Sequence, residues 1–149
     1  MNSIFEPTTK SEILRRIDSL TPQSQALWGK MSVSQMLKHC SEGAGLATGA
    51  LRAKRSFIGR TIGPFFKSLT VNEKPFSKNS PTLPQLVITG DPDFEKERAH
   101  LRRVVEELSD GGPSKTGVQP HPFFGKLEPE AWGTLSYKHL DHHLRQFGV

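Results

Sequence analysis

Hydrophobic residues recur at helical spacing in four segments of this chain, and capping residues, glycines or prolines mark the ends of these segments. Ser32 is expected to cap the second helix, and Asp91 the third, with Pro92 at its first position. Pro129 is expected to begin the last helix. The four apolar stripes are Ile13, Leu14, Ile17 and Leu20 within residues 9–20; Val33, Met36, Cys40, Ala44 and Ala47 within 32–49; Phe94, Leu101, Val105 and Leu108 within 91–111; and Tyr137, Leu140, Leu144 and Phe147 within 129–147.

Four amphipathic stripes are buried most simply in an antiparallel four-helix bundle, so the sequence predicts an all-α fold. The length of 149 residues suits one domain, which is predicted to span residues 1–149. Residues 70–90 carry three prolines and little periodicity. We expect a long ordered loop there, and a loop of this length often has a function or covers an opening in the core.

Composition limits the classes of protein to which the chain can belong. The formal net charge of +5 is modest for a dedicated nucleic-acid binder. No apolar run reaches the roughly 20 residues that a membrane-spanning helix needs. The single cysteine, Cys40, excludes an internal disulfide, and no secretory signal is visible. We therefore expect a cytoplasmic protein without a membrane partner.

Residues 51–69 combine an apolar stripe with a basic flank. Such a flank commonly solvates a helix that faces the core, and it could also bind phosphates or an acidic thiol cofactor. The basic residues are Arg52, Lys54, Arg55, Arg60 and Lys67.

Three histidines carry the most informative spacing in the chain. His139 and His143 are four positions apart, so on a helix both imidazoles lie on one face, beside the apolar stripe. His39 lies about 60° to one side of the stripe on the second helix. It shares that flank with Gly43, which leaves space beside it. Three imidazoles can hold zinc, nickel, iron or copper and leave one coordination position open. Alternatively, the histidine pair is only a polar or half-buried helix flank.

Five further residues have competing interpretations. His142 is expected to be exposed or to lie behind the metal ligands, and His100 is expected to be solvated. His121, which precedes an apolar turn, is expected to dock a loop rather than to bind metal. Cys40 is either a buried structural thiol or a reactive or metal-binding cysteine. Glu42 is either a surface carboxylate or a general base or hydrogen-bond partner of an imidazole.

Several motifs, taken in order, resemble the DinB/YfiT-like superfamily, and most closely its branch called domain of unknown function 1569. The resemblance covers roughly residues 10–148, and its motifs are Trp28–His39 (WGKMSVSQMLKH), Pro81–Pro84 (PTLP), His121–Leu127 (HPFFGKL) and the ending His139–Gly148 (HLDHHLRQFG). It implies a four-helix bundle that holds a divalent metal, zinc or nickel, through His39, His139 and His143. Some relatives are S-transferases that use thiols such as mycothiol or bacillithiol. This chain departs from the common His-Arg-Gly-Gln ending by having Leu144 before Arg145, and it carries the additional His142.

The leading hypothesis is a metal-dependent thiol S-transferase or hydrolase whose open coordination position holds a water or a substrate thiol. A low-molecular-weight thiol or another small molecule would be the substrate. The loop at 70–90 and the turn at 121–127 would form the mouth of the pocket. One alternative is a non-catalytic bundle, which could form a homodimer, in which the metal site is structural or vestigial. A less favoured alternative is a weak nucleic-acid-binding module that uses the basic flank.

Overall fold

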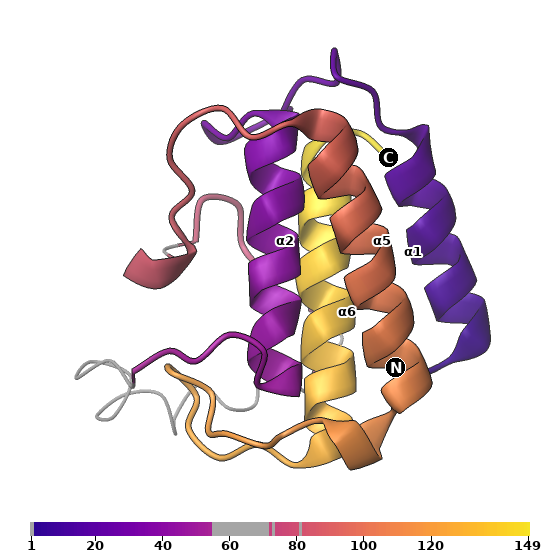
Figure 1. Cartoon of the computed structure of the whole chain (residues 1–149), viewed down its shortest axis with the longest axis vertical. Coiled ribbons are helices and arrows are strands. Elements are labelled where there is room, and N and C mark those ends of the chain that lie inside the picture. The colour runs from indigo at the N-terminus through magenta and orange to yellow at the C-terminus, as the bar shows by residue number, and fades with distance from the viewer. Residues whose placement is uncertain (1, 55–71, 73, 81) are drawn as a thin grey trace.

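Four helices form the framework of the computed structural model, which describes residues 2–54, 72, 74–80 and 82–149 (Figure 1). They are α1 (Pro7–Ser19), α2 (Val33–Thr48), α5 (Phe94–Gly111) and α6 (Pro129–Gln146). Two short 3-10 turns, η2 (Pro84–Leu86) and η3 (Pro113–Lys115), lie in the connections. The described residues contain no β-strand, only an isolated bridge between His121 and Gly125. The prediction of an all-α four-helix bundle is confirmed.

The helices do not all run antiparallel to their neighbours, as the sequence led us to expect. Gln35, at the start of α2, donates its side-chain N–H to the carbonyl of Gly90, just before α5, at 2.8 Å. The main-chain N–H of Ile4, just before α1, donates to the carbonyl of Gly133, near the start of α6, at 3.1 Å. Therefore α2 and α5 are parallel, as are α1 and α6. The long connection between α2 and α5 returns the chain to the end of the bundle at which α2 began (Figure 1).

Local capping chemistry sets the helix ends, and it corrects one prediction. Ser32 caps α2 in a reciprocal pair, because its hydroxyl accepts the N–H of Gln35 and the Gln35 side chain accepts the N–H of Ser32. Pro129 begins α6 as predicted. The prediction that Asp91 caps the third helix is wrong, since Asp93 accepts the N–H of Lys96 at 2.7 Å and α5 begins after it. A cap accepts from the third helical residue, and Asp93 alone stands in that register.

The core forms where the apolar stripes of the four helices meet. Its most enclosed side chains, each less than 2% exposed or close to it, are Ile13 and Ile17 of α1, Met36, Leu37 and Leu46 of α2, Leu101 and Leu108 of α5, and Trp132, Leu140 and Leu144 of α6. None of the helices in the described part of the chain is long and apolar enough to cross a membrane. That the whole chain forms one domain stays a prediction.

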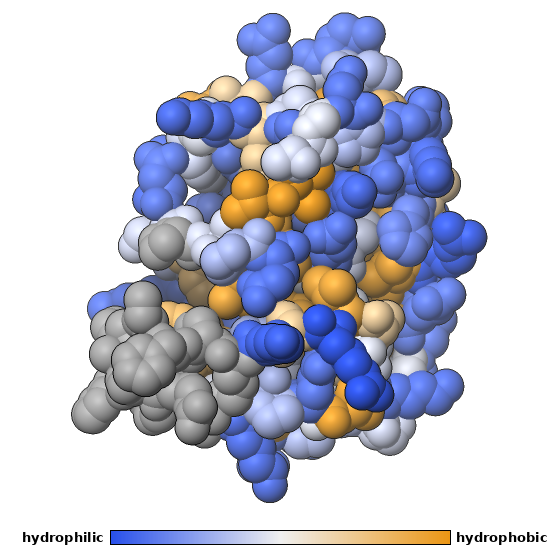
Figure 2. Space-filling model, turned by 60° about the vertical axis from the view of Figure 1, so that its left-hand side comes forward, coloured by the Kyte–Doolittle hydropathy of each residue, from blue (hydrophilic) through white to orange (hydrophobic). Residues whose placement is uncertain are grey.

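The connection between α2 and α5 covers one side of the bundle. Its described residues between 72 and 90 contain only η2, as expected of an ordered loop. On this side hydrophobic residues reach the surface only in small patches between hydrophilic ones (Figure 2). Of the basic flank, Arg52 and Lys54 are exposed. Arg55, Arg60, Lys67 and the whole apolar stripe, from Phe57 to Leu69, lie outside the described residues.

Candidate metal centre

Three histidines from two helices meet at the contact between α2 and α6. His39 comes from α2, and His139 and His143 come from successive turns of α6. One ring nitrogen of each can be chosen so that all three lie within 4.8 Å of one another. His39 and His143 are buried and His139 is half-buried. The structure thus brings together the three residues that the sequence singled out, at the distances of a group that could hold a metal ion.

A main-chain carbonyl orients the imidazole of His39. The Nδ1 atom of His39 lies 2.8 Å from the carbonyl oxygen of Leu86, in η2. A carbonyl can only accept, so this Nδ1 carries the proton and the Nε2 atom presents a lone pair. That Nε2 atom lies 3.0 Å from Nε2 of His139. The covering loop therefore fixes the tautomer in which His39 can serve as a ligand.

A side-chain amide orients His143 in the same way. The Nδ1 atom of His143 lies 2.8 Å from Oε1 of Gln146, and Nε2 of Gln146 donates to the carbonyl of Trp28 at 2.6 Å. Because that carbonyl needs a donor, the amide oxygen must face His143, and Nδ1 of His143 donates to it. The Nε2 atom of His143 is left with a lone pair. Sequence reasoning missed the roles of Gln146 and Leu86, although Gln146 stands one helical turn after His143.

The position of the His139 ring depends on a glycine of α2. A Cβ atom added at Gly43 would lie 2.6 Å from Cε1 and 2.9 Å from Nδ1 of His139. No side chain fits between them, so the imidazole lies directly on the bare α2 backbone. The space that the sequence predicted beside His39 exists, and His139 fills it.

The spacing of the rings suits a small cation after a modest adjustment. The ring centroids of His39, His139 and His143 are 4.7 to 4.9 Å apart. Nitrogen ligands of tetrahedral zinc, at about 2.05 Å from the metal, are about 3.3 Å from each other. The His39–His139 nitrogen pair, at 3.0 Å, already matches this spacing. The donor set therefore fits a divalent transition metal once its widest nitrogen pair, which lies within 4.8 Å, closes by up to about 1.5 Å.

Burial keeps these imidazoles neutral. Burial, with a further contribution from neighbouring His39, lowers the pKa of His143 to about 3. Burial and the adjacent rings of His143 and His39 hold the pKa of His139 well below its usual range. Burial lowers the pKa of His39 as well. Near neutral pH all three rings are therefore free bases, which is the state that binds metal.

The structure also places the other candidate residues. His100 is exposed, as predicted. His121 docks its loop, since its Nδ1 accepts the N–H groups of the next turn. Cys40 is buried beside Met36, and burial raises its pKa, so the interpretation as a structural thiol is supported.

His142 and Glu42 have less decisive surroundings. His142 is half-buried rather than exposed; its ring lies behind His143 at 4.9 Å and against the edge of Trp28 at 5.8 Å. Glu42 is half-buried, and within the described ranges no hydrogen bond or ion pair involves it. Its role as a general base or as a partner of an imidazole therefore stays a prediction.

Comparison with known proteins assigns the chain to a family without a known activity. A family model described as "Protein of unknown function (DUF1569)" matches residues 5–148. No curated protein and no solved structure matches the chain. The match spans nearly the whole sequence and includes all three histidines of the centre and the glutamine that orients one of them. The chain belongs to the family of proteins of unknown function DUF1569.

Proposed function

We propose that this protein binds a divalent metal ion, zinc or nickel, through His39, His139 and His143. The observation that supports the proposal most strongly is the orientation of two ligands by partners that hold their Nδ1 protons. Because Leu86 and Gln146 hold the Nδ1 protons of His39 and His143, the Nε2 atom of each ring carries a lone pair, and that of His39 faces Nε2 of His139 at 3.0 Å. Outer hydrogen bonds of this kind are the usual companions of metal-binding histidines. Imidazole nitrogen suits zinc and nickel equally, so the metal itself has to be measured.

We further propose that the site is catalytic, as a thiol S-transferase or a hydrolase. Three protein ligands leave one position of a tetrahedral ion open, which is the arrangement of catalytic rather than structural zinc sites. A metal in this position lowers the pKa of a water or thiol beside it. The three histidines would hold the ion. Leu86 and Gln146 orient His39 and His143, and the absence of a side chain at Gly43 leaves room for the ring of His139.

Metal analysis of the purified, untagged protein tests the binding. We expect about one ion per chain after growth in metal-replete medium, and a loss of most of it in His143→Ala. The matched control is His100→Ala, which removes an exposed histidine from α5 and should leave the metal content unchanged. A wild-type content below about 0.1 ion per chain, equal to that of His143→Ala, would refute the proposal.

Cobalt substitution separates a catalytic site from a structural or vestigial one. Cobalt(II) in an open three-histidine site should change its visible spectrum when a thiol is added, because sulfur enters the vacant position. The affinity for that thiol should fall in His139→Ala. A cobalt spectrum that does not respond to any thiol, in a protein whose melting temperature rises with metal, would favour the structural alternative.

A further inference from the structure

A second set of polar groups lies next to the histidine centre, on the loop that precedes α6. This loop is fixed to the end of α2: the N–H of Gly117 donates to the carbonyl of Ala47 at 3.0 Å. The side chain of Gln119 donates to the carbonyls of Leu46 and Leu51 at 3.2 and 2.6 Å. The loop is therefore held against the end of α2, the helix that carries His39.

Within this loop, His121 is fixed as a hydrogen-bond donor. Its Nδ1 atom accepts the main-chain N–H of Phe123 at 3.1 Å and that of Phe124 at 3.2 Å. A ring nitrogen that accepts carries no proton, so the neutral ring carries its proton on Nε2. Burial lowers the pKa of His121 to about 4, which keeps the ring neutral near pH 7. No residue in the described ranges accepts the Nε2–H.

Trp132 offers a second donor beside it. The ring centroids of His121 and Trp132 are 5.3 Å apart. Trp132 is only 2% exposed, and its indole N–H has no hydrogen-bond partner within the described part of the chain. A Cβ atom added at Gly117 would lie 3.4 Å from this nitrogen, so the N–H edge faces a residue without a side chain. Buried donors are almost always paired, so an unpaired one calls for an acceptor from outside the chain.

These two donors lie on the side of α6 that carries the histidine centre. Trp132 precedes His139 by seven positions, which places the two on nearly the same face and about 10 Å apart along the helix axis. His121 is close enough to His139 to contribute to the lowering of its pKa. The distance along α6 between Trp132 and the histidine centre is therefore comparable with the length of a small-molecule substrate.

We propose that His121 Nε2–H and Trp132 Nε1–H form a subsite that binds the carboxylate of a small-molecule substrate whose reacting thiol end lies at the three histidines. Both groups can only donate, so they select an oxygen acceptor and cannot bind an ammonium group. A carboxylate makes stronger hydrogen bonds with such donors than a neutral carbonyl does. The proposal rests on the proposed metal function, and it adds the substrate class: a carboxylate-bearing thiol.

Two substitutions remove the donors and keep the surrounding structure. His121→Asn retains an oxygen that can accept the main-chain N–H two residues on, as in an Asx turn, and removes the Nε2–H. Trp132→Phe retains a buried aromatic ring and removes the indole N–H. His100→Asn is the matched control, because it makes the same change at an exposed histidine of α5.

Binding to the cobalt-substituted protein is the first measurement. The probes are mercaptoacetate, 4-mercaptobutyrate and 6-mercaptohexanoate, each paired with the aminoalkanethiol of the same length. We expect one of the carboxylates to bind more tightly than its amine partner. The dissociation constant of this carboxylate should rise about tenfold in His121→Asn and in Trp132→Phe. The two substitutions should not change the dissociation constant of the amine, and His100→Asn should not change that of the carboxylate. Equal effects on both probes, or no effect on either, would overturn the subsite.

A metal-free measurement separates failure of the subsite from failure of the metal site. Butyrate is titrated into isotope-labelled protein, and the indole N–H resonance of Trp132, assigned with Trp132→Phe, is followed by NMR. A downfield shift in the wild type that is absent in His121→Asn supports the subsite even if the chain takes up no cobalt. If butyrate produces no shift, the subsite is wrong, whatever the outcome of the metal analysis.

Discussion

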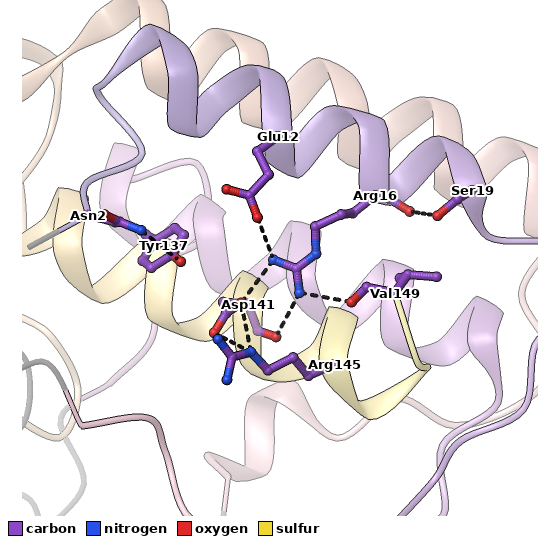
Figure 3. A network of polar contacts seen from close by, with 8 residues as sticks. All are labelled: Asn2, Glu12, Arg16, Ser19, Tyr137, Asp141, Arg145 and Val149. Atoms are coloured by element: carbon purple, nitrogen blue, oxygen red, sulfur yellow. Dashed lines mark hydrogen bonds and ion pairs between the residues drawn. The ribbon is translucent and has the colours of Figure 1, made fainter.

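The two sides of α6 bury polar groups in opposite ways. On one side Asp141 accepts from Arg16 at 2.9 Å and from Arg145 at 3.0 Å, and Arg16 also donates to the main-chain oxygen of Val149 at 2.9 Å (Figure 3). The side chains of Arg16 and Asp141 are only 7% and 10% exposed. The two buried charges of this network, Arg16 and Asp141, thus pair with each other.

The other side of α6 carries His139 and His143, which with His39 form a cluster of neutral bases. The ion pairs in the described part of the chain include no carboxylate bound to these rings. One ring nitrogen of each histidine lies within 4.8 Å of the others, and Nε2 of His39 is at hydrogen-bond distance, 3.0 Å, from Nε2 of His139. The Asp141 network therefore pairs opposite charges within the chain and serves the fold. The histidine cluster instead gathers three rings whose pKa values are all lowered by burial.

Removing the charge of Asp141 should produce the largest loss of stability and no loss of metal. In Asp141→Asn the guanidinium of Arg16 remains buried without its closest anion, and we expect unfolding free energy to fall by about 3 kcal/mol. Metal affinity should be unchanged. Urea denaturation and a metal-competition titration check the two parts. Asp110→Asn, which breaks the exposed pair with Lys10, should cost less than about 1 kcal/mol. A reduced metal affinity in Asp141→Asn would show that the two sides are coupled.

Adding a methyl group at Gly43 should weaken metal binding and leave the stability of the fold nearly unchanged. Gly43→Ala favours the helix by about 0.5–1 kcal/mol, so the metal-free protein should lose little stability. The new Cβ displaces the His139 ring, and we expect metal affinity to fall by up to about a hundredfold. Competition with a zinc chelator measures this. The control is Gly45→Ala on the same helix, where the methyl group would meet Leu51 at 3.3 Å and no histidine. Equal affinities in the two variants would contradict the role given to Gly43.

Removing the amide of Gln146 should weaken the metal site by a smaller factor. Gln146→Met keeps the length of the side chain but loses the acceptor for His143 and the donor to Trp28. We expect metal affinity to fall about tenfold. Gln119→Met, which removes two hydrogen bonds from a loop amide instead, should lower stability without changing metal affinity. The proposed orientation of His143 is wrong if both variants bind metal like the wild type.

Acid should lower the free energy of unfolding gradually, because the buried histidines become protonated on unfolding. The part of this loss that comes from His121 can be measured separately. The pKa of His121 is about 4 in the folded chain and about 6.5 when unfolded, so the unfolded chain takes up the proton first as pH falls. The contribution of His121 is complete above pH 6.5 and is lost between about 6.5 and 4, at no more than about 1.4 kcal/mol per pH unit. Denaturation at several pH values should show a shallower dependence in His121→Asn than in His100→Asn. Identical slopes would mean that His121 is not held neutral by burial.

Much of the centre could be predicted from helical phase. The four-residue spacing of His139 and His143, and the shared flank of His39 and Gly43, are properties of single helices and appear in the sequence. The sequence also contains the correct cap of α5, because Asp91 and Asp93 are both aspartates near the helix start. Only the register of the first turn decides between them, and the presence of Pro92 favoured the wrong one.

The partners of the histidines could not be found in this way, because they come from remote parts of the chain. The carbonyl of Leu86 meets His39 across 47 positions, and Trp28 meets Gln146 across 118. A main-chain carbonyl has no signature in the sequence. The sequence also could not show that α2 and α5 run parallel, because an apolar stripe does not determine the direction of a helix in the bundle.

Helical periodicity alone predicts which faces of the helices are apolar and which histidines lie beside them, because it fixes direction around a helix axis. The packing of the chain is needed to show that His39, His139 and His143 meet and that Leu86 and Gln146 fix the tautomers of two of them. It is also needed to show that His121 and Trp132 present donors without an acceptor among the described residues. These facts depend on how helices and loops pack across the bundle. Packing is set by the combined fit of many side chains, which no single stretch of sequence contains.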